Sequence, residues 1–92
     1  MLAQLVSFSG RIINTKNELL VGAYVTIAGQ QPTTLTTDIE GKFYTKIEGG
    51  KKYTISVSNA GYEPKQVRDV EVRPSQDNFL EIVLQESSKS NL

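Results

Sequence analysis

The sequence predicts an all-β protein, with seven short strands arranged as a two-sheet sandwich or a partly open barrel. Three observations support this fold class. Apolar and polar residues alternate with a period of two in short blocks, no helical periodicity recurs, and clusters of Gly, Pro, Asn and Asp separate the blocks at regular intervals. The 92 residues provide room for a single domain with a thin core.

The first three expected strands lie in the N-terminal half of the chain. Residues 6–12 and 23–27 alternate cleanly, and a polar turn over residues 14–18 separates them. A shorter strand over residues 33–37 follows, with Leu35 pointing inward. The inward-facing residues expected in the first two strands are Val6, Phe8, Gly10, Ile12, Ala23, Val25 and Ile27.

A turn signal over residues 36–43 predicts a hairpin between the third strand and a fourth. The Asp38 side chain can accept a hydrogen bond from the backbone two residues on, and Gly41 can adopt the positive φ that closes such a turn. Asp38 and Glu40 also suggest a calcium site, but two carboxylates without further acidic neighbours are too few. We therefore expect a capped turn and no metal ligands.

Four further strands are expected in the C-terminal half. Phe43, Thr45 and Ile47 alternate with polar residues, and residues 49–51 are expected to close a second hairpin. Strands over residues 53–58, 67–72 and 79–85 complete the set. We expect residues 1–86 to form the domain and residues 87–92 to form a flexible C-terminal tail.

Composition excludes several classes of function. Ten basic and ten acidic residues cancel and are interspersed, so we expect no nucleic-acid partner. The absence of Cys and His removes disulfides, thiolate nucleophiles and imidazole sites, and we expect no catalytic residues and no cofactor. No apolar run is long enough for membrane insertion, and residues 1–6 are too short and uncharged for a complete signal peptide.

An ordered set of short motifs resembles one family. The motifs are Gly-Arg-Ile-Ile-Asn over residues 10–14, Leu-Val-Gly-Ala-Tyr-Val-Thr-Ile over 20–27, Thr-Asp-Ile-Glu-Gly-Lys-Phe over 37–43, Gly-Lys-Lys-Tyr-Thr-Ile-Ser-Val over 50–57 and Gly-Tyr over 61–62. Together they resemble the carboxypeptidase regulatory-like domain, a transthyretin-like (prealbumin-like) seven-stranded Greek-key β-sandwich related to Cna-B-type repeats. The chain departs from the family where Leu19, Leu20 and Val21 replace the usual Pro before Gly22.

The resemblance implies a non-catalytic accessory module that stabilises, spaces or docks a larger protein. Such modules occur beside metallocarboxypeptidase catalytic domains, in bacterial surface proteins and at the start of TonB-dependent receptors, which favours the cell surface, the periplasm or secretion. A protein partner or a parent polypeptide is implied, with this chain as an excised module or a small stand-alone protein. The Lys–Asn isopeptide crosslink of some Cna-B relatives is not expected, because Arg11 replaces the inward first-strand Lys and Lys16 lies in a turn, so we expect no crosslink to Asn78.

Four outward apolar residues form the candidate interaction surface. Tyr24 and Tyr44 are expected to lie near one another, either as an aromatic platform for a glycan or a protein, or as a structural cross-strand pair. Phe79 and Val83 make the last strand apolar on both sides, so the N-terminal segment covers it or it marks an interface. The alternative function is therefore a carbohydrate- or peptide-binding module that uses the tyrosines or an open strand edge.

Overall fold

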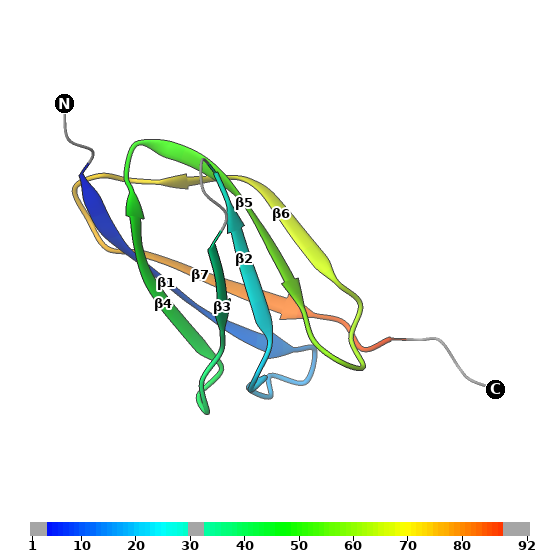
Figure 1. Ribbon diagram of the computed structural model, residues 1–92. Helices are drawn as coiled ribbons and strands as arrows, with labels where there is room; N and C mark the ends of the chain where they lie inside the picture. The colour runs from blue at the N-terminus through cyan, green and yellow to red at the C-terminus, as the bar shows by residue number, and fades with distance from the viewer. Residues whose placement is uncertain (1–3, 30–32, 88–92) are drawn as a thin grey trace.

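The computed structural model describes residues 4–29 and 33–87, and it shows seven β-strands in two packed sheets (Figure 1). The predicted all-β sandwich is confirmed. The strands are β1 Leu5–Asn14, β2 Tyr24–Ala28, β3 Thr33–Thr36, β4 Lys42–Glu48, β5 Lys51–Ser58, β6 Lys65–Val72 and β7 Asn78–Leu84.

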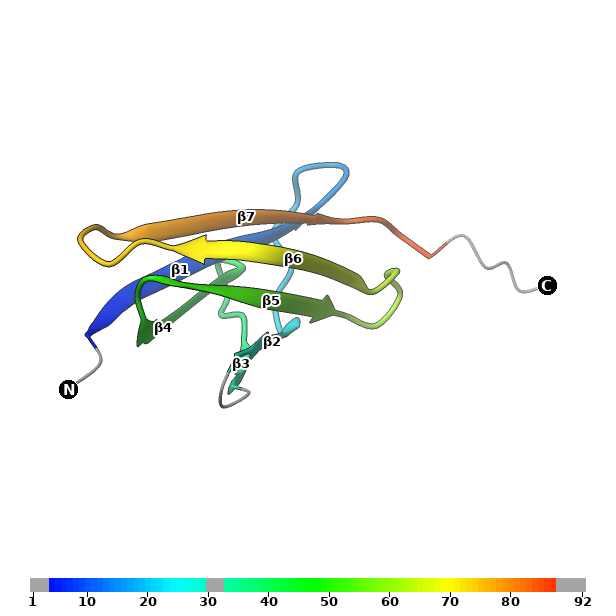
Figure 2. The ribbon, with the colours of Figure 1, turned by 90° about the horizontal axis from the view of Figure 1, so that it is seen from above.

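The two sheets have the strand orders β4-β1-β7 and β3-β2-β5-β6. Strands β1 and β7 pair in parallel, whereas every other pairing is antiparallel. Figure 2 shows β7 beside β1, with β5, β2 and β3 in the other layer. The first and last strands are therefore neighbours, which brings distant parts of the sequence together on one surface.

The structure corrects both predicted hairpins. The turn at Asp38 is as tight as expected: Gly41 has a φ of 71° and donates its N–H to the Asp38 carbonyl at 2.9 Å. It nevertheless joins β3 to β4, and these strands lie in different sheets. The turn at Gly49 likewise passes from β4 to β5 across the sandwich. The hydrogen bonds of a tight turn do not determine the sheet that the next strand joins, because longer-range pairing decides it.

The core lies between the sheets and consists of the inward residues of both layers. Most of the predicted inward residues are buried there, including Phe8, Ile12 and Phe43, while Val6, Leu35 and Ile47 pack against its margin. The Phe8 and Phe43 rings are tilted, with centroids 5.8 Å apart. The buried apolar set is Phe8, Ile12, Ile13, Leu20, Ala23, Val25, Ile27, Phe43, Tyr53, Ile55, Val57, Val72, Ile82 and Leu84.

Three buried polar residues fasten the connections between strands. Asn78 donates from its amide to the carbonyls of Ser7, Arg73 and Gln76, and its Oδ1 accepts the Arg73 N–H at 2.9 Å. Asn14 and Thr37 are also buried and hydrogen-bonded. Because each has partners, burial does not leave a polar group unsatisfied. Asn78 is thereby assigned a structural role in the turn before β7.

The chain after β7 continues along the β5–β6 connection. Glu86 forms an isolated bridge with Tyr62, and Ser87 donates its N–H to the Gly61 carbonyl at 2.9 Å. The rest of the tail expected over residues 87–92 lies outside the described residues.

Candidate functional site

The outer surface of the β4-β1-β7 sheet presents a row of two aromatic side chains with a small residue between them. Residues Phe8, Gly10 and Ile12 of β1 point into the core, so their odd-numbered neighbours point outward. Ser9 is paired with Tyr44 of β4 on one side and with Phe79 of β7 on the other. Tyr44 is 60% exposed and Phe79 is 62% exposed. Neighbouring strands lie about 4.8 Å apart, so the two aromatic residues flank Ser9 at about 10 Å from one another.

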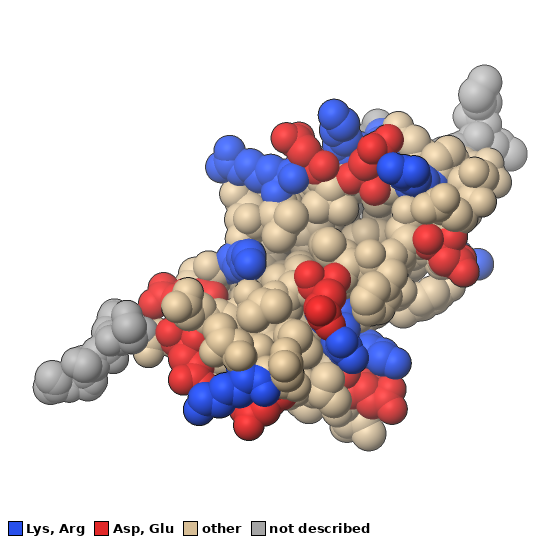
Figure 3. All heavy atoms as spheres, turned by 180° about the vertical axis from the view of Figure 1, so that it is seen from behind, with Lys and Arg blue, Asp and Glu red and all other residues tan. Residues whose placement is uncertain are grey.

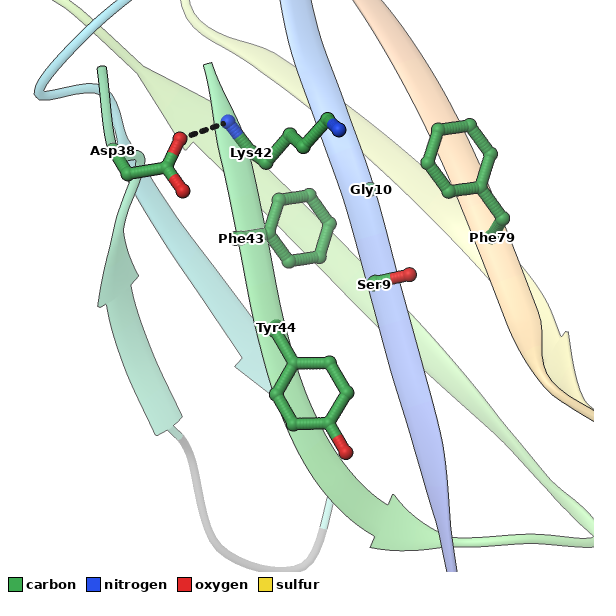
Figure 4. A pocket seen from close by; sticks show the side chains of 7 residues that line it. All are labelled: Ser9, Gly10, Asp38, Lys42, Phe43, Tyr44 and Phe79. Carbon is green, nitrogen blue, oxygen red and sulfur yellow. Dashed lines mark hydrogen bonds between the residues drawn. The ribbon is translucent and has the colours of Figure 1, made fainter. Parts of the chain in front are cut away.

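A hollow of about 310 Å³ lies at this row. Figure 4 shows Tyr44 and Phe79 projecting from the two edge strands, with Ser9 on the strand between them. Gly10 and Phe43, which are directly paired, complete the lining together with Asp38 and Lys42. The hollow therefore combines aromatic walls with hydroxyl, ammonium and carboxylate groups.

Charged residues lie on either side of the aromatic row. On one side, Arg11 is paired with Lys42 and with Glu81, and its Nε lies 3.0 Å from Glu81 Oε2. On the other side, Ser7 is paired with Lys46 and donates its hydroxyl to Asp77 Oδ1 at 2.7 Å. We call these three rows the aromatic face; its residues are Ser7, Ser9, Arg11, Lys42, Tyr44, Lys46, Asp77, Phe79 and Glu81.

Asp38 at the rim of the hollow is held as a turn residue. Its Oδ1 accepts the backbone N–H groups of Lys42 and Glu40, each at 2.9 Å. These hydrogen bonds, with Lys42 contributing most, hold the pKa of the Asp38 carboxyl below its ordinary value of 3.8. Glu40 pairs with Lys42 Nζ at 3.5 Å. The contacts are those of the capped turn that the sequence predicts.

The structure separates the two tyrosines that the sequence places together. Tyr24 lies on β2, in the four-stranded sheet, whereas Tyr44 lies on β4 in the other sheet. Both are exposed on the outer surfaces of their own layers, so the expected platform and the expected cross-strand pair of these two residues are both wrong. Period-two alternation shows only that each side chain points away from the core. It does not show which sheet carries the strand.

The last strand is apolar on both sides, as expected. Phe79 and Val83 point outward, while Ile82 and Leu84 are buried. The N-terminal strand lies beside β7 in the same sheet and leaves Phe79 exposed. Of the four candidate residues, Tyr44, Phe79 and Val83 thus belong to the outer side of one sheet.

The C-terminal half of β7 is less open as an edge for an added strand. Lys65 Nζ, from the other sheet, lies 3.4 Å from the Val83 carbonyl oxygen. The Gln85 carbonyl accepts the Glu63 N–H at 2.8 Å. Contacts that occupy edge carbonyls oppose the addition of a strand, so binding of a peptide along this part of the edge is disfavoured.

We also searched the described residues for a metal site and for a membrane-spanning helix. Within residues 4–29 and 33–87, no group of three His, Cys, Asp or Glu residues is placed to hold a metal ion. The same part of the chain contains no helix long and apolar enough to span a membrane. Figure 3, seen from behind, shows Lys and Arg interspersed with Asp and Glu.

Sequence reasoning did not find the aromatic row as a unit. It singled out Tyr44 and Phe79 for separate reasons and did not connect Ser9 with either residue. The row depends on the register of three strands, two of which pair in parallel across most of the chain length. The alternation of β1 indicated that Ser9 points outward, but no local pattern identified its neighbours.

The fold defines a small β-sandwich module with one exposed aromatic face. The chain belongs to the carboxypeptidase regulatory-like domain family, which it matches over residues 7–85. The predicted family is therefore confirmed, and this family is non-catalytic. Among curated protein sequences, none matches this chain at a significant level.

Solved structures share the fold at low sequence identity. Chlorocatechol 1,2-dioxygenase from Pseudomonas putida is 12% identical with a TM-score of 0.75, over 91% of this chain and 61% of that protein. The Bacillus anthracis TIE protein is 20% identical with a TM-score of 0.72, over 90% of this chain and 17% of that protein. A putative carbohydrate-binding protein from Bacteroides uniformis is 19% identical with a TM-score of 0.71, over 86% and 40%. The chain thus spans less than two thirds of these proteins, and the likeness concerns the fold alone.

Proposed function

We propose that this chain is a non-catalytic accessory module that docks onto a protein partner or its parent polypeptide through the aromatic face. The observation that carries the proposal is the row Tyr44–Ser9–Phe79, in which two large aromatic side chains remain exposed on one sheet surface. Aromatic residues are enriched at interfaces because they bury a large area at a small cost in side-chain entropy. The family supports an accessory role, and the absence of His and Cys opposes a catalytic one.

Site-specific photo-crosslinking in the native host tests this proposal. A photoreactive amino acid is placed at position 44, at position 79, or at position 24 as the matched control. Tyr24 and Tyr44 are 58% and 60% exposed, so solvent access alone does not distinguish the two positions. We expect protein adducts from positions 44 and 79 and none from position 24. Adducts from position 24 alone, or from no position, contradict the proposal.

A second candidate function, carbohydrate binding, is favoured by the hollow itself. Sugar rings stack on aromatic side chains, and the hollow adds a hydroxyl from Ser9 and charged groups from Lys42 and Asp38. The Bacteroides uniformis protein, which shares this fold, is described as a putative carbohydrate-binding protein, and this supports the candidate. Titration of the isotope-labelled chain with a panel of oligosaccharides is the test. Shift changes confined to Ser9, Tyr44 and Phe79 support this candidate, and a flat response removes it.

A further inference from the structure

We infer that the partner of the aromatic face is a second copy of the same face. This inference rests on the proposed docking function and identifies the docking partner. Its basis is the arrangement of charge in two parallel columns. Lys42, Tyr44 and Lys46 project from β4, whereas Asp77, Phe79 and Glu81 occupy the corresponding positions at β7.

Each column has the order charged, aromatic, charged, but the signs are opposite. Within these three rows, the β4 column is basic at both ends and the β7 column is acidic at both ends. The next outward residue of β4, Glu48, lies beyond the rows and is paired with Lys51 of its own chain at 2.9 Å. The central column on β1 contains Ser7, Ser9 and Arg11, of which the two serines are small. The face is therefore divided along β1 into a basic side and an acidic side, with one aromatic residue on each.

A twofold axis that runs along β1 matches this pattern with itself. Rotation about that axis places the β4 column of one copy over the β7 column of the other. Each Tyr44 then meets the other copy's Phe79, and each Lys42 meets the other copy's Glu81. Such an interface is self-complementary, as twofold symmetry requires. The central serines leave room for the aromatic side chains to approach.

The alternative twofold axis lies in the plane of the face and runs perpendicular to the strands. The same charges oppose it. It places the β4 column over the β4 column of the other copy, so that Lys42 faces Lys46. It also places Asp77 over Glu81. Like charges in contact disfavour association, so the charge pattern selects the axis along β1. Two sheets packed face to face in this way lie within about 30° of alignment.

Existing contacts on the face are compatible with this pairing. The twofold axis along β1 brings the two Arg11 side chains toward each other. The charge of each is already neutralised by Glu81 of its own chain. Lys42 is 3.5 Å from Glu40 in an exposed pair, which costs little to rearrange. The face is only about 15 Å wide. The surface area that it can bury is therefore below that of a standard protein–protein interface. We therefore expect a weak dimer that forms at high concentration and low salt.

Charge exchange across the face provides the test. Sedimentation velocity is recorded from about 10 μM to 1 mM, at low and high salt, with circular dichroism to verify folding of each variant. Glu81→Lys and Lys42→Glu each create like-charge contacts and should weaken dimerisation by about tenfold or more. The double variant Lys42→Glu with Glu81→Lys keeps the net charge and exchanges the charges at these two positions only, so that opposite charges again meet across the axis and most of the affinity should be recovered. Arg11 retains a carboxylate partner in the double variant, since position 42 is its other register neighbour.

Controls separate this inference from the broader proposal. Lys52→Glu reverses a charge on β5 of the other sheet and should leave the dimer unchanged. Tyr44→Ala removes an exposed side chain and should abolish dimerisation without loss of fold. A wild-type chain that stays monomeric at 1 mM and low salt overturns the pairing, as does a folded double variant that fails to recover. If the chain is monomeric but position 44 crosslinks to another protein, the pairing fails while the docking proposal stands.

Discussion

Adding one methyl group at Gly10 tests the packing directly beneath the aromatic face. A Cβ at this position would lie 2.3 Å from the Leu80 carbonyl oxygen and 2.4 Å from Phe43 Cζ. The carbonyl belongs to the backbone of the neighbouring strand β7, so it cannot move without disturbing the β1–β7 pairing. The Phe43 ring is buried and already packed against Phe8. Gly10→Ala therefore forces a shift in both the sheet and the core.

We expect Gly10→Ala to lower the free energy of unfolding, whereas an ordinary Gly→Ala change raises it. Where the native backbone accepts it, that change stabilises a protein by about 0.4–1 kcal/mol through the unfolded chain. Overpacking of a dense core costs about 1–3 kcal/mol, and two simultaneous clashes place Gly10→Ala near the upper end. With an m-value of about 1 kcal/mol per M in urea, the midpoint should fall by about 2–3 M. Equilibrium urea unfolding, followed by circular dichroism, measures this shift.

A double-mutant cycle assigns the cost to its two sources. Phe43→Leu removes the ring but leaves the Leu80 carbonyl in place. In that background, Gly10→Ala should cost less than in the wild type and still remain destabilising. A wild-type midpoint that is unchanged or raised by Gly10→Ala refutes the packing described here.

Three further predictions concern residues that hold the scaffold. Phe43→Ala should lower the free energy of unfolding by about 3–5 kcal/mol, measured by urea titration, because it empties a buried site against Phe8. Asn78→Asp should cost about 3 kcal/mol or more near neutral pH, because a carboxylate then faces three backbone carbonyls; thermal melts should show a smaller loss in acid, where the carboxyl can donate again. Asp38→Asn should lower the melting temperature near neutral pH. The folded-state pKa of Asp38 is depressed, so its contribution is present above the unfolded value and is lost as pH falls through the folded value; the difference between the two proteins should therefore disappear in acid.

Much of the sandwich could be predicted from the sequence because short local patterns indicate where strands and turns form. The alternation that placed Phe8, Ile12 and Val25 inward is the alternation that burial requires. Turn residues also gave correct local geometry, as at Gly41, where a positive φ was expected and is observed.

The assignment of strands to sheets was not predictable in the same way. Asp38 and Gly41 form the same turn whether the chain returns to one sheet or crosses to the other. For this reason Tyr24 and Tyr44, which appear equivalent in the sequence, lie on different layers. Asn14 and Asn78 were missed as buried anchors because their residue type and position in turns also fit exposed loops.

Oxidative footprinting of the aromatic side chains tests the central claim, that this module binds its partner through the aromatic face. In the dilute purified chain, Tyr24 and Tyr44 are almost equally exposed, at 58% and 60%, so hydroxyl radicals should oxidise them at similar rates. In native material, where the partner is present, we predict that Tyr44 and Phe79 become protected while Tyr24 does not. Protection of Tyr24, with Tyr44 and Phe79 still oxidised, would contradict the account.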